Sequence, residues 1–196
     1  MQRSGFARSD GYSFIEILLA LGLVTTLAGI AVPVASGTID DIRAAGAARH
    51  VAARIAMTRL EAVRRSSSVA LRFQQQGRDY AFTPFLDGNG NGLRAADINN
   101  GVDHPLGPTE RLGDQFGDAG FGLLPGIPDL DGVVGNEDGV RIGPSAFLSV
   151  SSNGSCTGGT IYVHGRRTQY AVRVLGATGR VRFFRYDTGT GRWITR

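Results

Sequence analysis

The sequence predicts an α+β fold in which a long N-terminal helix packs on a C-terminal antiparallel β-sheet or small sandwich. Two observations predict it. Residues 12–66 have helical character, first apolar on every side and then apolar on one face. From residue 67 the chain changes to short runs of alternating apolar and polar residues, separated by glycine-rich turns, which is typical of antiparallel strands. The apolar N-terminus leaves enough of the 196 residues for one domain with a modest core.

The N-terminal run is apolar enough to cross a membrane. The 18 residues from Ile17 to Val34 carry no charge, and at about 1.5 Å per residue they span most of a ~30 Å hydrocarbon core. Glu16 stands at the start of this run, and an ionisable residue in a membrane is costly enough to indicate a function. A secretory signal peptide cleaved near residues 34–37 is the alternative interpretation of the same run.

The second half of the predicted helix, residues 35–66, is rich in Ala, Arg and Leu, which are good helix formers. Pro33 is expected to kink the junction between the halves, because proline removes a backbone donor and clashes with the preceding turn. Arg59 interrupts the apolar face. Helical spacing predicts that this face is formed by Ile42, Ala45, Ala52, Ile55, Ala56, Leu60 and Val63.

The stretch Gly11-Tyr12-Ser13-Phe14-Ile15-Glu16, followed by the apolar run, resembles the class III signal of type IV pilins and pseudopilins. The resemblance implies that a prepilin peptidase removes residues 1–11 as a leader peptide, by cutting between Gly11 and Tyr12, and methylates the new N-terminal Tyr12. Most family members have Phe at that position, so Tyr12 departs mildly from the pattern. Glu16 matches the signature glutamate of the family, and Pro33 matches its helix-kinking proline.

The same resemblance implies a structural role without catalysis. The protein would lie in the bacterial inner membrane through residues 12–34, with residues 35–66 as an amphipathic helix and residues 67–196 as a periplasmic domain. It would assemble with other pilins or pseudopilins into a type IV pilus or the pseudopilus of a type II secretion system. Glu16 would then pair with the N-terminal amine of a neighbouring subunit, which makes its burial in lipid tolerable. The alternatives are a Glu16 that reaches interfacial water alone, and an ordinary membrane-anchored domain.

The globular part is expected to begin with a hairpin of residues 68–74 and 79–87. Five further strand-like runs follow toward the C-terminus, with glycine turns between most of them. The end of the helix with the first strand, the stretch FLDGNGNG, and the last strands resemble the GspH/FimT group of minor pilins and pseudopilins. Residues 87–143 are expected to form an acidic, glycine-rich loop insert.

Two sites on this domain have competing interpretations. Asp87, Asn89 and Asn91 occupy the first half of an EF-hand-type calcium loop, with Asp97 one residue before the place of the missing closing Glu. The alternative is a hairpin tip without metal. Arg180 and Arg182 resemble a G-R-x-R run with which some FimT-like minor pilins bind DNA, and arginines also suit phosphates in general. The alternative is a solvated face of an alternating strand.

The remaining residues give no support to an enzyme or a cofactor site. The three histidines are far apart in the sequence, without metal spacing, and the single Cys156 cannot form an intramolecular disulfide. Charge is unevenly distributed. Residues 87–138 contain ten acidic residues and two Arg, a net charge of −8, whereas residues 165–196 contain eight Arg and one Asp, a net charge of +7. Such asymmetry marks either interaction surfaces or solvated faces.

Overall fold

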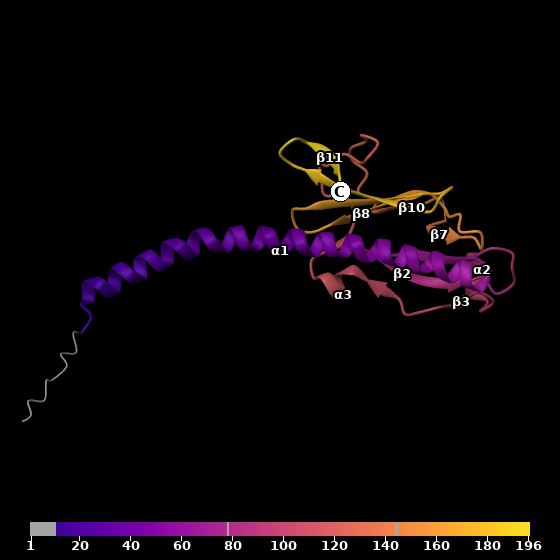
Figure 1. Cartoon of the computed structure of the whole chain (residues 1–196), viewed down its shortest axis with the longest axis horizontal. Helices are drawn as coiled ribbons and strands as arrows, with labels where there is room; N and C mark the ends of the chain where they lie inside the picture. Colours follow the sequence, from indigo (N-terminus) through magenta and orange to yellow (C-terminus); the bar gives the residue numbers. More distant parts are fainter. Residues whose placement is uncertain (1–10, 78, 144) are drawn as a thin grey trace, which may run out of the picture. The chain divides into compact units, whose positions relative to one another are not determined.

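The computed structural model describes residues 11–77, 79–143 and 145–196, with the side chains of residues 32–34 excepted. The chain divides into two compact units, residues 1–38 and residues 39–196. The long helix α1 (Phe14–Arg65) has residues in both units. The predicted α+β class is confirmed, since a long apolar N-terminal helix is followed by antiparallel β-sheets (Figure 1).

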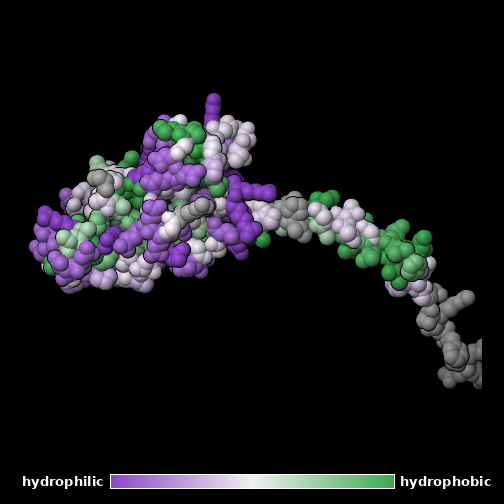
Figure 2. All heavy atoms as spheres, turned by 180° about the vertical axis from the view of Figure 1, so that it is seen from behind, coloured by the Kyte–Doolittle hydropathy of each residue, from purple (hydrophilic) through white to green (hydrophobic). Residues whose placement is uncertain are grey.

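In the first unit, α1 begins where the carbonyl of Ser13 accepts the backbone N–H groups of Glu16 and Ile17. The helix is long and apolar enough to cross a membrane by length and composition, and its most apolar window buries no residue within the protein. Figure 2 shows these apolar side chains gathered along the N-terminal part of the helix. Pro33 lies within α1, but its side chain is outside the described residues, so the predicted kink stays a prediction.

In the second unit, α1 ends in a Schellman motif. The N–H of Ser67 bonds to the carbonyl of Ala62, and the N–H of Ser66 bonds to the carbonyl of Val63. Ser66 has a φ of 50°, a left-handed conformation that is usually taken by glycine at this position. The motif satisfies two carbonyls at the helix end and turns the chain directly into the first strand.

The strands of the second unit form two antiparallel sheets. The first sheet has the order β3-β2-β1-β7, with β4 also paired to β2. Its strands are β1 (Val69–Gln76), β2 (Asp79–Leu86), β3 (His104–Pro105), β4 (Glu110–Arg111) and β7 (Phe147–Val150). The predicted hairpin is confirmed, because β1 pairs with β2 and their tight turn opens with Gly77 at a φ of 67°.

The second sheet has the order β11-β10-β9-β8-β5, with β6 also paired to β8. Its last four strands follow one another as a meander through glycine-containing turns, as predicted. Its strands are β5 (Gly120–Phe121), β6 (Val140–Arg141), β8 (Gly159–His164), β9 (Gln169–Leu175), β10 (Arg180–Asp187) and β11 (Arg192–Thr195).

The insert differs from the predicted loop because it is folded against the rest of the second unit. It contributes β3 and β4 to the first sheet and β5 and β6 to the second. It also contains two short helices, α2 (Ala95–Asn99) before β3 and α3 (Leu112–Phe116) between β4 and β5. Two-residue strands separated by glycines have no alternating pattern, so the sequence could not reveal them.

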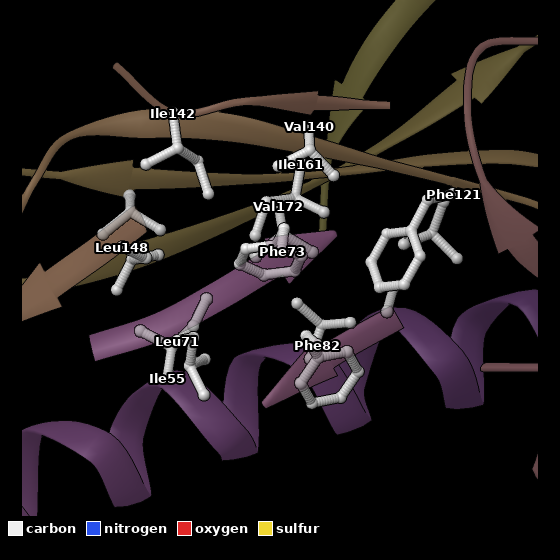
Figure 3. Close-up of a cluster of buried hydrophobic side chains, with 14 of the residues drawn as sticks. Ile55, Leu71, Phe73, Phe82, Phe121, Val140, Ile142, Leu148, Ile161 and Val172 are labelled. Atoms are coloured by element: carbon white, nitrogen blue, oxygen red, sulfur yellow. The ribbon is translucent and has the colours of Figure 1, made fainter. Parts of the chain in front are cut away.

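One core cluster joins the helix to both sheets. Ile55 of α1, Phe73 of β1 and Val172 of β9 all belong to it (Figure 3). The helix contributes mostly small side chains, and its buried residues in the second unit are Asp40, Ala44, Ala47, Ala48, Val51, Ile55, Thr58 and Ala62.

The predicted inward face of the helix is therefore confirmed for Ile55, Ala45 and Ala52, which belong to the core cluster or pack against it, and wrong for the other members. Among its members only Ile55 is buried, whereas Ile42, Leu60 and Val63 are exposed. The reason is the close approach of the helix to the rest of the unit. A Cβ on Gly46 would lie only 3.1 Å from the ring of Phe116, so small residues are required on this side. Hydrophobic periodicity predicts that the large side chains face the core, but the close approach of the helix leaves room mainly for alanines there.

Candidate functional site

Large apolar side chains line the face of α1 that points away from the core of the second unit. Ile42 and Leu60 are each 65% exposed, and Met57 and Val63 are also more than half exposed. One stripe at helical spacing runs along this face. Its positions recur every seven residues at Ile42, Arg49, Ala56 and Val63, with Ala53 and Leu60 three or four residues from their neighbours in the series. This stripe, residues 42–63, is called the outer stripe. Single exposed apolar residues are ordinary, but several on one helix face favour an interaction surface, which Arg49 interrupts here.

The predicted processing and assembly residues lie at the start of the first unit. Gly11 and Tyr12 precede α1, and Tyr12 is 81% exposed. Glu16 lies exposed in the first helical turn, where a negative charge interacts favourably with the helix dipole. Leader residues 1–10 lie outside the described residues. The cleavage, the methylation and the pairing of Glu16 stay predictions.

Asp40 fixes the beginning of the second unit's helix to the turn between β8 and β9. Its carboxylate accepts the backbone N–H of Arg166 at 2.6 Å and that of Arg167 at 3.0 Å, and it accepts the hydroxyl of Thr168 at 3.0 Å. Burial alone would raise the pKa of Asp40, but these hydrogen bonds lower it below its ordinary value. The side chain would clash with a Cβ on Gly165, so only glycine fits there.

Asp41, the next residue, connects the helix to two strands of the second sheet. It accepts the hydroxyl of Tyr170 at 2.9 Å and lies 3.2 Å from the guanidinium of Arg185. Burial, together with the hydrogen bond to Asp41, raises the pKa of Tyr170 to about 12. Sequence reasoning missed both aspartates, because a polar pair inside a helix gives no signal until its strand partners are known.

Glu110 of β4 makes the corresponding connection to the first sheet. It is buried, forms an ion pair with Arg54, and lies 2.8 Å from Nε2 of His50. The ring of His50 also contacts the rings of Phe82 and Phe116. Asp40, Asp41, His50 and Arg54 therefore attach α1 to both sheets, while the outer stripe carries no such partners among the described residues.

The comparisons with known proteins give one match. The pilin-like protein PilA1 of Thermus thermophilus is 35% identical over 81 residues, which cover 41% of this chain and 50% of that protein. The match supports a type IV pilin-like protein. The chain spans about half the length of the curated relative it matches. No protein-family model and no solved structure matches the chain.

The two described parts of α1 differ in their surroundings. The apolar part could be a single membrane span, and the outer stripe leaves Ile42, Leu60 and Val63 exposed on the second unit. The narrower assignment to the GspH/FimT group stays a prediction, since the match does not distinguish between pilin subgroups.

The predicted calcium residues lie in a loop closed by its own hydrogen bonds. The carboxylate of Asp87 is buried and accepts the backbone N–H groups of Asn89, Gly90 and Gly92. Asn89 and Asn91 are exposed and Asp97 is half-buried. Within the described ranges, no three His, Cys, Asp or Glu side chains are grouped so that they could hold a metal ion. Calcium binding stays a prediction without structural support.

Arg180 and Arg182 lie on β10 with exposed side chains. Val181 and Phe183, which alternate with them, pack against the core cluster. Other arginines of this region have acidic partners. Arg166 lies 2.9 Å from Asp118 and Arg173 lies 2.9 Å from Asp131, both partners in the insert. The basic strands and the acidic insert therefore neutralise each other in part, which the sequence did not reveal.

Proposed function

We propose that this protein is a structural subunit that assembles into a type IV pilus or a pseudopilus, as a minor pilin or pseudopilin of the GspH/FimT group. The observation that carries the proposal is the outer stripe. The helix already packs against its own domain through alanines, so its large apolar side chains remain for a contact with other subunits. Burying one such side chain contributes about 1.5–3 kcal/mol, so several of them favour assembly.

Assembly begins with the removal of residues 1–11 by a prepilin peptidase. The cut gives Tyr12 a cationic amine four residues before Glu16. In the membrane, the Glu16 carboxylate of an arriving subunit pairs with the amine of a subunit already in the filament. The burial penalty of an unpaired carboxylate then favours the assembled state. The globular unit stays in the periplasm, and the role is structural without catalysis.

The first experiment is the intact mass and N-terminal sequence of the membrane-extracted protein, expressed with and without a prepilin peptidase. The expected product begins at methylated Tyr12 and appears only with the peptidase. A full-length product in both samples, or a cut near Gly37, would contradict the proposal.

The second experiment is Glu16→Ala in the full chain, expressed with the peptidase and its filament partners. We expect membrane insertion to persist and sedimentable filaments to be lost, because the variant cannot pair with a neighbour's amine. The matched control is Glu61→Ala on the same helix, where Glu61 pairs with Arg64 and Arg65 of its own chain. Normal assembly of Glu16→Ala would end the pairing mechanism.

A second candidate function is DNA binding during uptake. It is favoured by the exposure of Arg180 and Arg182 and by the absence of an ion-pair partner for either among the described residues. The double variant Arg180→Ala/Arg182→Ala should reduce the slope of log affinity against log salt by about two. The matched control is Arg166→Ala/Arg173→Ala, because those arginines already have acidic partners. An unchanged slope in the first variant would end this candidate.

A further inference from the structure

Two exposed arginines lie on the β8–β9 turn, and the proposed function does not use them. The backbone N–H groups of Arg166 and Arg167 donate to the buried carboxylate of Asp40, while both side chains are exposed. Asp40 lies at the beginning of the helical part of the second unit. The hydrogen bonds therefore hold two guanidinium groups beside this part of α1.

Arg43 of α1 belongs to the same group of cations. Its guanidinium lies 3.7 Å from the carboxylate of Asp118, and the guanidinium of Arg166 lies 2.9 Å from the same carboxylate. The side chains of Arg43 and Arg166 nevertheless stay 50% and 72% exposed. Arg43, Arg166 and Arg167 are called the arginine cluster. Its three guanidinium groups face one exposed carboxylate, which leaves a net charge of +2.

The charged groups around the arginine cluster do not cancel this charge. Asp40 is buried and accepts donors of the turn. Asp41 pairs with Arg185, and it lines a groove of about 340 Å³ together with Arg49 and Arg196. Arg49 and Arg196 are exposed and have no ion-pair partner in the part of the chain that the structure describes. Positive charge therefore exceeds negative charge on this part of the second unit.

Position along the chain brings the arginine cluster close to the predicted membrane span. The uncharged run ends at Val34, and Asp40 follows six residues later. As part of α1 these six residues rise about 9 Å, and even a fully extended chain would reach at most about 22 Å. The turn is bonded directly to Asp40. With residues 12–34 in the bilayer, the long arginine side chains are thus within reach of the headgroup layer.

We propose that the arginine cluster binds the headgroups of anionic phospholipids in the membrane that holds the chain's own N-terminal helix. A guanidinium group offers five donors in a planar fork that matches phosphate oxygens, and this chain has no Lys. An anionic surface attracts cations next to a membrane span, whereas a zwitterionic headgroup carries its own cation. The contact holds the second unit at the membrane surface before assembly. The inference rests on the proposed function in one respect, the membrane span of residues 12–34.

Lipid titration of the full chain tests the contact. The chain in a non-ionic detergent is titrated with phosphatidylglycerol or with phosphatidylcholine, and native mass spectrometry measures the lipid retained. Each arginine at an anionic surface contributes about fivefold in affinity, so the wild type should prefer phosphatidylglycerol at least about tenfold. Arg166→Gln/Arg167→Gln should lower this preference at least about fivefold. The change keeps the backbone donors to Asp40, so the turn stays in place.

The matched control is Arg64→Gln/Arg94→Gln, which removes the same charge from exposed arginines elsewhere. Arg64 lies 24 residues after Asp40 on α1, about 36 Å along the helix, and the N–H of Arg94 bonds to Asp103 in the insert. The control should keep the preference of the wild type. Circular dichroism and unfolding midpoints should agree among the three proteins, because every replaced side chain is exposed.

The outcomes are distinct. An equal loss of preference in both double variants would overturn the contact, since charge at any position would then suffice. Inorganic phosphate that displaces phosphatidylglycerol at constant ionic strength would assign the arginine cluster to the free ion and overturn the lipid contact. A chain that is processed and forms filaments but binds both lipids alike would overturn the contact and leave the proposed function intact. A chain recovered outside the membrane fraction would overturn both.

Discussion

The insert and the C-terminal strands have opposite charge, but they place their charged groups differently. Four of the insert's acids are buried, namely Asp87, Asp103, Glu110 and Asp129. The eight arginines of residues 165–196 all stay at least partly exposed. The acidic region therefore uses much of its charge inside the fold, whereas the basic region presents its charge to solvent and to the insert.

Side-chain length explains the difference. A short carboxylate can accept the N–H groups of its own loop, as Asp87 and Asp129 do. It thereby supplies hydrogen-bond acceptors that regular secondary structure would supply in a region whose strands are only two residues long. A long arginine buries its stem and keeps its charge at the surface. Net charge read from the sequence therefore overestimates the acidic surface of the insert.

The largest expected effect comes from Asp129→Ala. The change leaves the guanidinium of Arg141 without its carboxylate and frees the backbone donors of the insert loop, so we expect a loss of about 3–5 kcal/mol in the free energy of unfolding. Thermal and denaturant unfolding of the detergent-extracted chain, followed by circular dichroism and by the fluorescence of Trp193, measures it. Trp193 is a suitable probe because its Nε1 donates to the carbonyl of Pro128.

Asp131→Ala is the matched control for Asp129→Ala. Its carboxylate is exposed and pairs with Arg173 at the surface, so the loss should stay below about 1 kcal/mol. Equal losses in the two variants would break the comparison, because buried and exposed carboxylates of the insert would then contribute alike.

A smaller effect is expected from Asp40→Asn. This change removes the charge of the helix carboxylate that accepts hydrogen bonds from residues 166–168 of the basic region. Loss of the charged acceptor should cost about 2 kcal/mol at neutral pH. The pKa of Asp40 is lowered in the folded state, since its hydrogen bonds outweigh burial. Its contribution is therefore complete above the unfolded pKa of about 3.9 and is lost as pH falls through the lower folded value.

The stability of wild type and Asp40→Asn should thus converge below about pH 4. Unfolding midpoints measured from pH 7 down to acid pH test this expectation. Asp114→Asn is the control, since Asp114 is exposed on α3. A gap between wild type and Asp40→Asn that widens as pH falls would show that the sign is reversed and that Asp40 is not the group responsible.

The smallest expected effect is that of Arg182→Ala on folding. An exposed arginine without an ion-pair partner among the described residues should change the free energy of unfolding by no more than about 0.5 kcal/mol. The same unfolding experiment measures it, with Arg173→Ala for comparison because Arg173 also bonds to Thr160. A loss above about 2 kcal/mol for Arg182→Ala would mean that this residue stabilises the fold.

The sequence allowed the regular elements of this fold to be predicted. The hairpin of β1 and β2 and the C-terminal strands carry alternation and turn residues in their own segments, so local signals sufficed. The inward face of α1 could not be found in that way. It depends on how closely Phe116, seventy residues later, approaches Gly46, and no periodicity in the helix contains that distance.

The candidate site was predictable only where it rests on a motif. The stretch around Glu16 indicated the pilin-like character, which the match with PilA1 supports. The outer stripe was misassigned to the core, because large apolar residues at helical spacing have the same pattern whether their partner belongs to the same chain or to another. The anchoring role of Asp40 needed the position of residues 166–168, which only the fold supplies.

The three hydrogen bonds between Asp40 and the β8–β9 turn also have a mechanical consequence. Asp40 is the first buried residue of the second unit, two residues after the first unit ends at Thr38. Tension applied along α1 from its N-terminal end would reach these hydrogen bonds before it reached the alanine face. Because these three hydrogen bonds share the load, they would resist the pull together and protect the packing of the helix on the domain. Their failure would let the helix peel away one turn at a time.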